Sequence, residues 1–394
     1  MKNSVFNMYE LGELLFYEQP TQYIVESTEY CDQYLTPVLT AGKSFILGYT
    51  NEQDGVFTDV PVIIFDDFTT SSQYVTFPFK VKSSAMKILR PNTNLVLPKY
   101  IFYRMQIIQF DASTHKRYWI QQYSKIKVSV PPLEEQERIV SRIEELFSEL
   151  DAGVDTLQKI KQQLSVYRQA VLKQAFSGQL TCSSIQKLAP LSTFIENPRY
   201  GTSKKCGYER EEMSVNVYRI PNIKYSEGRI SHQDIKCAVL EPAELQELQL
   251  MKDDLLIIRS NGSVNLVGRA ALVRQEEQGD AYAGYLMRLR VTDKRKLLPY
   301  FLLLFLGSQQ ARSYIENKAK STSGVHNINS KEISNLLIPV FELADQEKIV
   351  EAIESRLSVC DSIDWTVDQA LQQSAAMRQS ILKQAFKGGA NAGV

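Results

Sequence analysis

The sequence lacks the patterns that mark membrane, disulfide-stabilised or metal-binding proteins. Its longest apolar run, Leu297 to Leu306, is far too short to cross a bilayer, and the opening residues 1–4 include no apolar signal segment. The five cysteines form no Cys-x-x-Cys pair, and the three histidines stand apart from one another. These absences predict a cytoplasmic protein without a disulfide framework or a metal site.

A net charge is also lacking, because 45 basic and 45 acidic residues cancel. A protein that meets DNA alone usually carries an excess of positive charge. The balance is uneven along the chain, however: residues 181–340 hold about 22 basic and 17 acidic side chains, and residues 1–130 hold about 12 of each. This distribution fits a chain that works beside a DNA-binding partner.

What the sequence does contain is an internal repeat with an offset of 210 residues. When residues 130–178 are laid over 340–388 without a gap, about 21 of the 49 pairs are identical. The segment Gln-Glu-Arg-Ile-Val at 136–140 recurs as Gln-Glu-Lys-Ile-Val at 346–350. The ending Leu-Lys-Gln-Ala-Phe-x-Gly occurs at both 172–178 and 382–388. One structural unit has been duplicated.

Each copy of the repeat has the pattern of a long helix. Apolar residues recur at steps of three and four, as in Ile139, Ile143, Leu146 and Leu150, which is the seam of a coiled coil. A glycine follows each copy, at Gly178 and Gly388, where a left-handed C-cap is expected. The economical interpretation pairs the two helices with each other, antiparallel, so that the chain has pseudo-twofold symmetry.

The segments outside the repeat have mixed α and β patterns, so the fold class is α+β. Strand-like runs occur at 45–49, 60–65, 254–259 and 285–290, and a helical run at 297–318. The predicted domains are 1–130 and 181–340, each followed by one repeat copy, at 131–180 and 341–394.

Three patterns that could indicate catalysis lack necessary partners. Gly42-Lys43-Ser44 resembles the end of a phosphate-binding loop, but Pro37 stands where the first glycine is required. Asn197-Pro198-Arg199-Tyr200 resembles a methyltransferase motif, but no glycine-rich loop precedes it. Asp66-Asp67 has no further acidic or lysine partner at nuclease spacing, so a turn is the more natural interpretation.

The chain resembles the specificity subunits of Type I restriction–modification enzymes over nearly its whole length. The segment 131–140 and the repeated helix ending are similar to the start and the end of the family's spacer helix. Residues 199–205, 219–223, 259–263 and 327–329 resemble one recognition domain of the family, and 40–44 and 65–70 resemble another variety. Two departures exist: Phe341-Glu342 replaces the second Pro-Pro, and the two domains hardly resemble each other. The second departure is expected if each domain reads a different half-site.

The resemblance implies a non-catalytic subunit that reads double-stranded DNA. It implies two target-recognition domains, which read the two halves of a bipartite target around an unspecified gap. It also implies two DNA-methyltransferase subunits held on the helices, and motor–nuclease subunits in the full complex. No cofactor is expected on this chain, since the methyl donor and ATP belong to the partners.

Candidate DNA-contacting residues lie in polar loops that carry cations, hydroxyls or asparagine, which bind phosphates or base edges. In each case a solvated turn is the alternative. In the first domain the candidates are Lys43, Thr69, Thr70, Ser71, Lys116 and Arg117. In the second domain they are Arg199, Tyr200, Gly201, Thr202, Ser203, Lys204, Lys205, Arg259, Asn261, Ser263, Lys320, Ser323 and Asn327.

Two other classes of function remain open at this stage. A coiled-coil adaptor that binds only proteins would show weak DNA binding even beside its partners. An enzyme hidden in the recognition domains would show hydrolysis or methyl transfer by the isolated chain.

Overall fold

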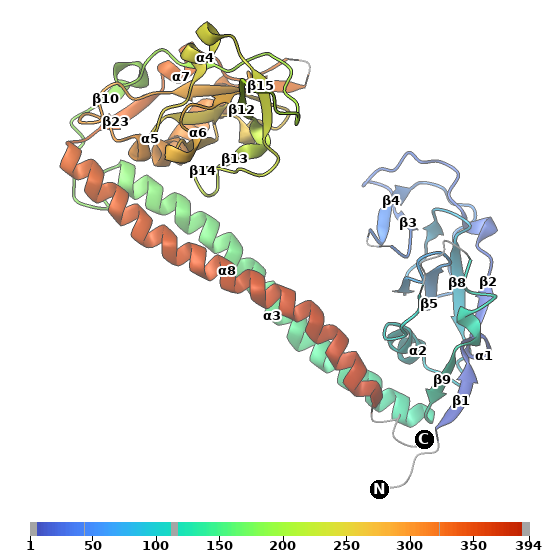
Figure 1. The fold of residues 1–394 in the computed structure, drawn as a ribbon. Coiled ribbons are helices and arrows are strands. Elements are labelled where there is room, and N and C mark those ends of the chain that lie inside the picture. Colours follow the sequence, from blue (N-terminus) through green and yellow to red (C-terminus); the bar gives the residue numbers. More distant parts are fainter. Residues whose placement is uncertain (1–5, 43, 112–116, 323, 388–394) are drawn as a thin grey trace. The chain divides into compact units, whose positions relative to one another are not determined.

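The computed structural model describes residues 6–42, 44–111, 117–322 and 324–387. The chain divides into two compact units (Figure 1). Unit 1 comprises Met1–Gln158 and Asp368–Val394, and unit 2 comprises Lys159–Val367. Two long helices contribute one part to each unit. They are α3 (Leu133–Phe176), of 44 residues, and α8 (Leu343–Lys387), of 45 residues.

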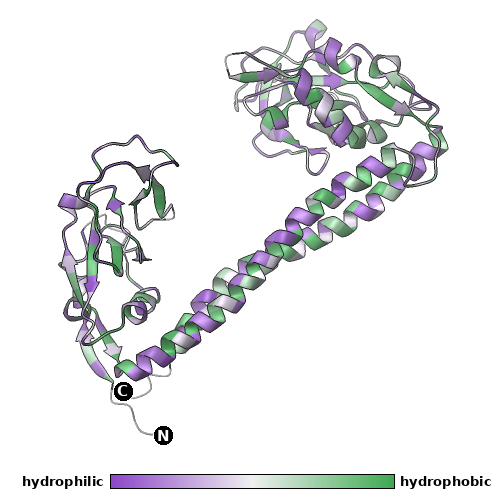
Figure 2. Ribbon diagram, turned by 180° about the vertical axis from the view of Figure 1, so that it is seen from behind, coloured by the Kyte–Doolittle hydropathy of each residue, from purple (hydrophilic) through white to green (hydrophobic). Residues whose placement is uncertain are grey.

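Helices α3 and α8 pack against each other, and apolar and polar residues alternate along both (Figure 2). In unit 1 the Arg378 guanidinium of α8 forms an ion pair with Asp151 of α3. In unit 2 Arg168 Nη1 of α3 lies 2.8 Å from Asp361 Oδ1 of α8. Residue numbers therefore rise along α3 while they fall along α8. The predicted antiparallel pair of long helices is confirmed.

The two ion pairs are equivalent members of the repeat. Adding 210 to Asp151 gives Asp361, and adding 210 to Arg168 gives Arg378. The pseudo-twofold symmetry seen in the sequence therefore holds for contacts between side chains. It has one local exception, because Arg168 also binds Asp364 (Nη2–Oδ2 2.6 Å), whereas valine occupies the equivalent position 154.

In unit 1 most strands form two small sheets, and a separate antiparallel pair joins the two ends of the domain. The four-stranded sheet has the order β2-β8-β5-β6, and the three-stranded sheet has the order β4-β3-β7. Strand β1 pairs antiparallel with β9, which leads directly into α3. The elements are β1 (Asn7–Glu10), α1 (Leu11–Leu14), β2 (Leu15–Glu18), β3 (Thr36–Leu39), β4 (Ile46–Thr50), β5 (Val62–Asp66), β6 (Ser72–Val75), β7 (Lys80–Val81), β8 (Met86–Pro91), α2 (Pro98–Met105) and β9 (Lys127–Val130).

Unit 2 is built around a six-stranded sheet of order β11-β20-β16-β18-β14-β13. Two three-stranded sheets, β15-β12-β19 and β17-β22-β21, and the pair β10-β23 complete it. The strands are β10 (Lys187–Pro190), β11 (Arg199–Tyr200), β12 (Ser214–Tyr218), β13 (Ile223–Lys224), β14 (Arg229–Ile230), β15 (Lys236–Val239), β16 (Leu255–Ile258), β17 (Ser260–Asn261), β18 (Ala270–Leu272), β19 (Ala281–Tyr282), β20 (Leu286–Leu289), β21 (Lys320–Thr322), β22 (Val325–Asn327) and β23 (Leu337–Val340). The helices are α4 (Pro242–Leu248), α5 (Pro299–Leu306), α6 (Gln309–Lys318) and α7 (Ser330–Ser334).

The strands predicted at 45–49, 60–65, 254–259 and 285–290 correspond to β4, β5, β16 and β20, with ends that differ by one or two residues. The predicted helical run 297–318 is wrong as a single helix, because α5 ends at Leu306 and α6 begins at Gln309. The Ser308 hydroxyl accepts a hydrogen bond from the Ala311 N–H and so starts a new helix.

A buried glutamine joins each long helix to its own unit in the same way. The Gln136 carbonyl oxygen accepts a hydrogen bond from Leu97 N (2.8 Å), and its amide donates to the main-chain oxygens of Leu95 and Pro131. Gln346 makes the equivalent three bonds with Leu298 N, Lys296 O and Phe341 O. Both side chains are almost fully buried. The repeated Gln-Glu segment is therefore a clasp that fixes the start of each helix.

The repeated helix ending is equally structural. Phe176 lies in edge contact with the rings of Phe301 and Phe305 of α5 (centroids 5.2 Å apart in both pairs). Phe386 meets Tyr100 of α2 in the same manner (5.3 Å). Gly178 has the predicted left-handed conformation (φ 77°), which a side chain would strain. Gly388 lies outside the described residues.

The hydrophobic cores extend into the long helices. In unit 1, Val140 and Ile143 of α3 and Leu382 of α8 belong to the core cluster that also holds Tyr100. In unit 2, Phe176 of α3 and residues 349 and 353 of α8 belong to the corresponding cluster. Among the described residues no helix has the length and apolarity needed to cross a membrane.

Candidate nucleic-acid interface

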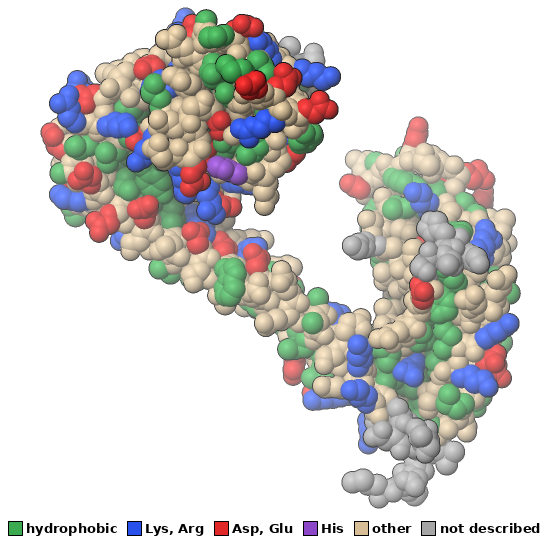
Figure 3. Space-filling view, viewed as in Figure 1, with side chains coloured by type: hydrophobic (Ala, Val, Ile, Leu, Met, Phe, Trp, Pro, Cys, Tyr) green, Lys and Arg blue, Asp and Glu red, His purple; other side chains and the backbone are tan. Residues whose placement is uncertain are grey.

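The surface of unit 2 contains an open hollow of about 660 Å³ that gathers basic and aromatic side chains. Its cations are Lys204, Arg219, Lys236 and Arg259, and its aromatic rings belong to Tyr200 and Tyr285. Of the described residues that line it, none is acidic. Elsewhere on the visible face of this unit basic and acidic side chains are interspersed (Figure 3). Cations bind the phosphates of a nucleic acid, and aromatic rings stack on its bases, so this lining suits a nucleic acid.

Arg259 and Tyr200 form a fixed pair at this hollow. The Arg259 guanidinium carbon lies 4.0 Å from the centre of the Tyr200 ring, and Nη1 donates to Gly284 O (3.3 Å). The Tyr200 hydroxyl accepts a hydrogen bond from Ser330 N (2.9 Å). A guanidinium that lies over a ring can still bind an anion or a guanine through its remaining N–H groups.

Gly201 follows this pair in the chain and allows close packing of the loop against its neighbour. A Cβ at this position would lie 2.1 Å from Tyr282 O and 2.5 Å from Ala283 O. Thr202 N donates to Tyr282 O, and Gly284 N donates back to Thr202 O. The loop 199–205 is therefore held against the segment 282–284 at its centre.

Acidic residues of helix α4 and its N-cap engage part of the predicted loop. Thr202 is buried, and its hydroxyl donates to Glu244 (2.6 Å). Lys204 Nζ lies 3.5 Å from Glu244 and 3.9 Å from Glu241. Ser203 and Lys205 are exposed. Lys204 is exposed as well, so of these four candidates Thr202 alone is both buried and bound to the protein. Arg199 also has an internal partner, Glu247, at 3.5 Å.

The candidates near 260 and 327 lie together because their strands pair. Ser260 pairs with Asn327 and Asn261 with His326, and Lys320 is the other partner of Asn327. The Asn261 side-chain oxygen accepts from Ser263 N (2.9 Å), which is the turn geometry that Asn-Gly also predicts. The amide nitrogen of Asn261 takes no part in this hydrogen bond.

Arg219, Lys236 and Tyr285 are the functional candidates that sequence reasoning missed. The Lys236 ammonium lies 4.9 Å from the centre of the Tyr208 ring, and Arg219 binds Asp234 (2.9 Å). The Tyr208 hydrogen bond, followed by that of Arg219, lowers the pKa of Asp234. Tyr285 is 64% exposed. These residues come from separate strand ends, so no local pattern groups them, although 219–223 does carry part of the family resemblance.

The same hollow also contains Cys206, whose pKa is shifted. Burial raises the pKa of the thiol, while Arg219 and Lys236 act in the opposite direction.

In unit 1 the candidates form one turn region after strand β5. Asp66 Oδ1 accepts hydrogen bonds from Phe68 N and Thr69 N, and Thr70 has a positive φ of 59°. Thr69 and Ser71 are exposed. Main-chain bonding from Tyr118 N to Asp67 O brings the exposed Arg117 beside this turn. The structure thus places together two candidate groups that are far apart in sequence.

Asp67 itself is structural. It is 1% exposed, accepts from Trp119 N (2.8 Å) and lies 3.5 Å from the equally buried Lys87. Burial lowers the pKa of Lys87, and Asp67 opposes that shift. The buried pair and the Asp66 turn support the interpretation of Asp66-Asp67 as a turn.

Three predicted site residues, Lys43, Lys116 and Ser323, lie outside the described residues. One group in the described part of the chain has the composition of a metal site. His232, Glu276 and Glu277 have ligand atoms within 4.8 Å of one another. Both carboxylate oxygens of Glu277 are already engaged. Oε2 accepts a hydrogen bond from Arg274 N (2.6 Å), and Oε1 lies 2.7 Å from His232 Nε2.

Comparison with known proteins gives concordant results. Residues 3–164 match the family model described as Type I restriction modification DNA specificity domain. The EcoR124I/EcoR124II specificity subunit of Escherichia coli is 30% identical over 94% of this chain and 90% of its own length. The StySPI specificity subunit of Salmonella potsdam is 28% identical, over 77% of this chain and 66% of the relative.

Solved structures show the same fold. A chain from a study of assembly and conformational transition of a type I R-M system has a TM-score of 0.71, with 16% identity and 98% of each chain covered. The HsdS subunit from Thermoanaerobacter tengcongensis has a TM-score of 0.52, with 17% identity, over 98% of this chain and 97% of the other.

Proposed function

Because the chain belongs to the family of Type I restriction enzyme specificity subunits, which recognise DNA sequence, we propose that its two units read the two halves of a bipartite target. Residues 1–130 and 181–340 are the two target-recognition domains, and 131–180 and 341–394 are the spacer helices. The observation that carries this proposal is a duplicated helical frame that holds two unlike surfaces. A duplicated reader of one sequence would have no reason for its two surfaces to diverge.

In the second domain the DNA contacts centre on the basic hollow. Among the predicted residues, Arg259, Ser203 and Lys204 line this hollow, and Arg219, Lys236 and Tyr285 join them. Lys205 is exposed on the same loop. The four lining cations are the supporting feature, since positive charge attracts phosphates. Two of them, Lys204 and Arg219, also pair with carboxylates outside the lining, those of Glu244 and Asp234. In the first domain, Thr69, Ser71 and Arg117 form the corresponding surface after β5.

The helix pair serves as the scaffold for two methyltransferase subunits, with motor–nuclease subunits added in the full complex. Large apolar side chains are exposed at equivalent positions of the two helices: Tyr167 is 47% exposed and Met377 is 53% exposed. Such side chains offer apolar contact area to a protein that docks on the helices. Two equivalent positions favour two copies of the same partner.

The chain contributes recognition and no catalysis of its own. Asp66-Asp67 is accounted for by a turn and a buried ion pair, and Arg199 lies in a short strand bonded to β20. Methyl donor and ATP belong to the partner subunits. Methyl transfer to DNA by this chain alone, with donor supplied and partners absent, would refute this part of the proposal.

The proposal is tested by sequencing the methylated sites in a host that expresses the complete system. The expected result is one bipartite target, with two specific halves around a gap of fixed length. A single continuous target, or methylation that does not depend on this chain, would contradict it. A chain that binds its partners and leaves DNA affinity unchanged would favour the adaptor alternative.

A further inference from the structure

Helix α4 and its N-cap residue carry three glutamates on the side that faces the predicted DNA-binding loop. They are Glu241, Glu244 and Glu247, which are spaced three residues apart and so lie along one face of the helix. Lys204 Nζ lies 3.9 Å from Glu241 Oε1 and 3.5 Å from Glu244 Oε2. Arg199 Nη1 lies 3.5 Å from Glu247 Oε2. This acidic face therefore engages two of the cations that the sequence predicts as DNA contacts.

The ion pairs of the acidic face are exposed to solvent. The exposed fraction of the side chain is 80% for Glu241, 63% for Glu247 and 52% for Arg199. Such ion pairs contribute little to stability, because water screens both charges. Glu244 is the most firmly held of the three, since its Oε1 also accepts a hydrogen bond from the hydroxyl of the buried Thr202 (2.6 Å). Stability of the fold therefore does not account for three carboxylates on this face.

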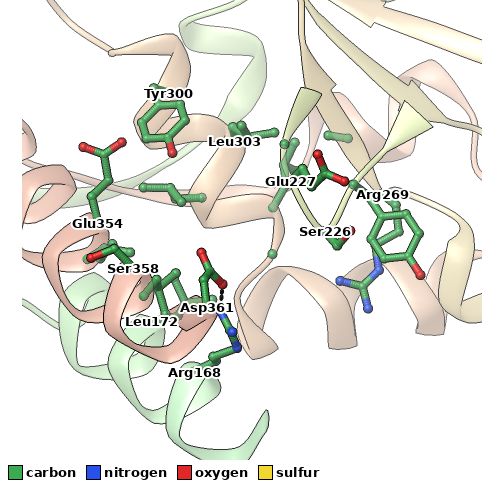
Figure 4. Close-up of a pocket in the computed structure, with 18 residues that line it drawn as sticks. Arg168, Leu172, Ser226, Glu227, Arg269, Tyr300, Leu303, Glu354, Ser358 and Asp361 are labelled. Atoms are coloured by element: carbon green, nitrogen blue, oxygen red, sulfur yellow. Dashed lines mark ion pairs between the residues drawn. The ribbon is translucent and has the colours of Figure 1, made fainter. Parts of the chain in front are cut away.

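The cations of another hollow in this unit are paired differently. The hollow of about 350 Å³ between α3, α8 and α5 contains Arg168 and Arg269. The carboxylates of Glu354 and Asp361 belong to the same lining (Figure 4). In the basic hollow, by contrast, the carboxylates that engage Lys204 lie outside the lining, on one short helix and its N-cap. A phosphate that enters the basic hollow can therefore compete with those carboxylates for the cation.

Such competition affects two kinds of DNA binding unequally. Carboxylates and phosphates bind the same N–H groups of arginine and lysine. Non-specific binding comes almost entirely from contacts between cations and phosphates, and any free cation can add to it because the protein samples many positions on the duplex. Base contacts fix the position of the protein on its target, so target binding gains less from one more free cation. A carboxylate that occupies a cation therefore weakens non-target binding more than target binding.

We propose that Glu241, Glu244 and Glu247 are specificity-determining residues, which hold Arg199 and Lys204 and so suppress binding to non-target DNA. This inference rests on the proposed function and adds to it a role for residues that do not touch DNA. The acidic face is an internal competitor for phosphates. Target DNA binds in spite of this competition, because base contacts elsewhere in the hollow supply the remaining free energy.

The test removes the charges of the acidic face and keeps its shape. Glu241→Gln, Glu244→Gln and Glu247→Gln are combined in one acidic-face variant. The glutamine oxygen at position 244 can still accept the hydrogen bond of the Thr202 hydroxyl. The assembled methyltransferase is titrated with its mapped target duplex and with a non-target duplex of equal length, from about 50 to about 200 mM salt.

Two controls separate the release of two cations from a general effect of charge. The first combines Glu209→Gln, Glu211→Gln and Glu212→Gln, which removes the same charge from exposed positions of the same unit. The second adds Arg199→Ala and Lys204→Ala to the acidic-face variant, so that the freed cations are absent again. Non-additive effects of the two sets of substitutions would show that the carboxylates act through these cations.

The acidic-face variant should bind non-target DNA more tightly and with a steeper salt dependence. The slope of log affinity against log salt should steepen by about 2, since each freed cation adds about 0.9. Over the salt range of the titration, its non-target affinity should therefore fall about tenfold more than that of the wild-type chain. Target affinity should rise less than about threefold, so the ratio of target to non-target affinity falls. The glutamate control should keep the wild-type slope, and loss of both freed cations should restore it.

An unchanged slope in the acidic-face variant, or an equal rise in target and non-target affinity, would overturn this inference and leave the proposed function intact. The same effect in the glutamate control would also overturn it. A wild-type assembly that does not prefer its mapped target would instead contradict the proposed function. Should the combined variant unfold, as shown by circular dichroism, Glu247→Gln alone takes its place. Its slope should steepen by about 1, and an unchanged slope again overturns the inference.

Discussion

The two units hold the long helices through the same contacts, but their exposed surfaces differ. Gln136 and Gln346 make the same three bonds, and Phe386 and Phe176 pack on α2 and α5 in the same way. The surfaces proposed to read DNA share no such match. Unit 1 offers a turn of hydroxyls with Arg117, while unit 2 offers a basic and aromatic hollow.

This difference shows which parts of the duplicated chain have been free to change. The glutamines that hold the helices have fixed partners inside the molecule. Replacement of one of them therefore leaves buried main-chain groups without a hydrogen bond. The reading surfaces face solvent, where substitution costs little stability. Recognition can therefore diverge between the units while the frame stays common to both.

The largest expected effect concerns the glutamine clasps. Gln136→Leu leaves Leu97 N and two carbonyl oxygens without their partners, which should cost about 3 kcal/mol in the stability of unit 1. Hydrogen exchange should accelerate around residues 95–105 and stay unchanged around 296–306. Gln346→Leu should give the opposite pattern. The exposed Glu137→Leu is the control, and equal acceleration in both units would show that the clasps are not local.

A smaller effect separates the two equivalent arginines. Arg168 binds two carboxylates, Asp361 and Asp364. Arg378 binds the carboxylate of Asp151, and its guanidinium carbon lies 4.6 Å from the centre of the Phe147 ring. Arg168→Ala should therefore cost about 1–2 kcal/mol, and Arg378→Ala about 0.5 kcal/mol. Denaturant unfolding at low salt measures both. The difference should shrink in 1 M salt, and a larger loss for Arg378→Ala would contradict the asymmetry.

The smallest effect lies within the loop 199–205. Lys204 and Lys205 are both exposed, but Lys204 lies near the carboxylates of Glu244 and Glu241. Replacing both with alanine should weaken DNA binding by the assembled methyltransferase and flatten its salt dependence. Lys205→Ala alone should account for most of the change, lowering affinity a few-fold. A double variant with an unchanged salt slope would remove both lysines from the DNA surface.

Much of the frame could be predicted from the sequence, because a repeat with coiled-coil spacing specifies both the helices and their pairing. The 210-residue offset also makes Arg168 and Arg378 equivalent positions from the sequence alone. The break at Ser308 was missed, since an apolar run followed by a polar one keeps helical periodicity across a cap.

The candidate site was less accessible to such reasoning. Arg199 to Lys205 is continuous in sequence, but the acidic residues of α4 that engage Thr202 and Lys204 lie about forty residues away. Arg219, Lys236 and Tyr285 meet only through the strand order of unit 2. Local composition reveals a basic loop, and tertiary pairing decides which of its cations have a carboxylate partner within the protein.

Exchange of one recognition domain tests the central claim, a common frame with independent readers, most directly. Residues 181–340 are replaced with the corresponding domain of another family member, and methylated sites are mapped in a host with the full system. The account predicts that one half of the target changes while the other half and the gap length stay the same. A change in both halves, or in the gap, would contradict it.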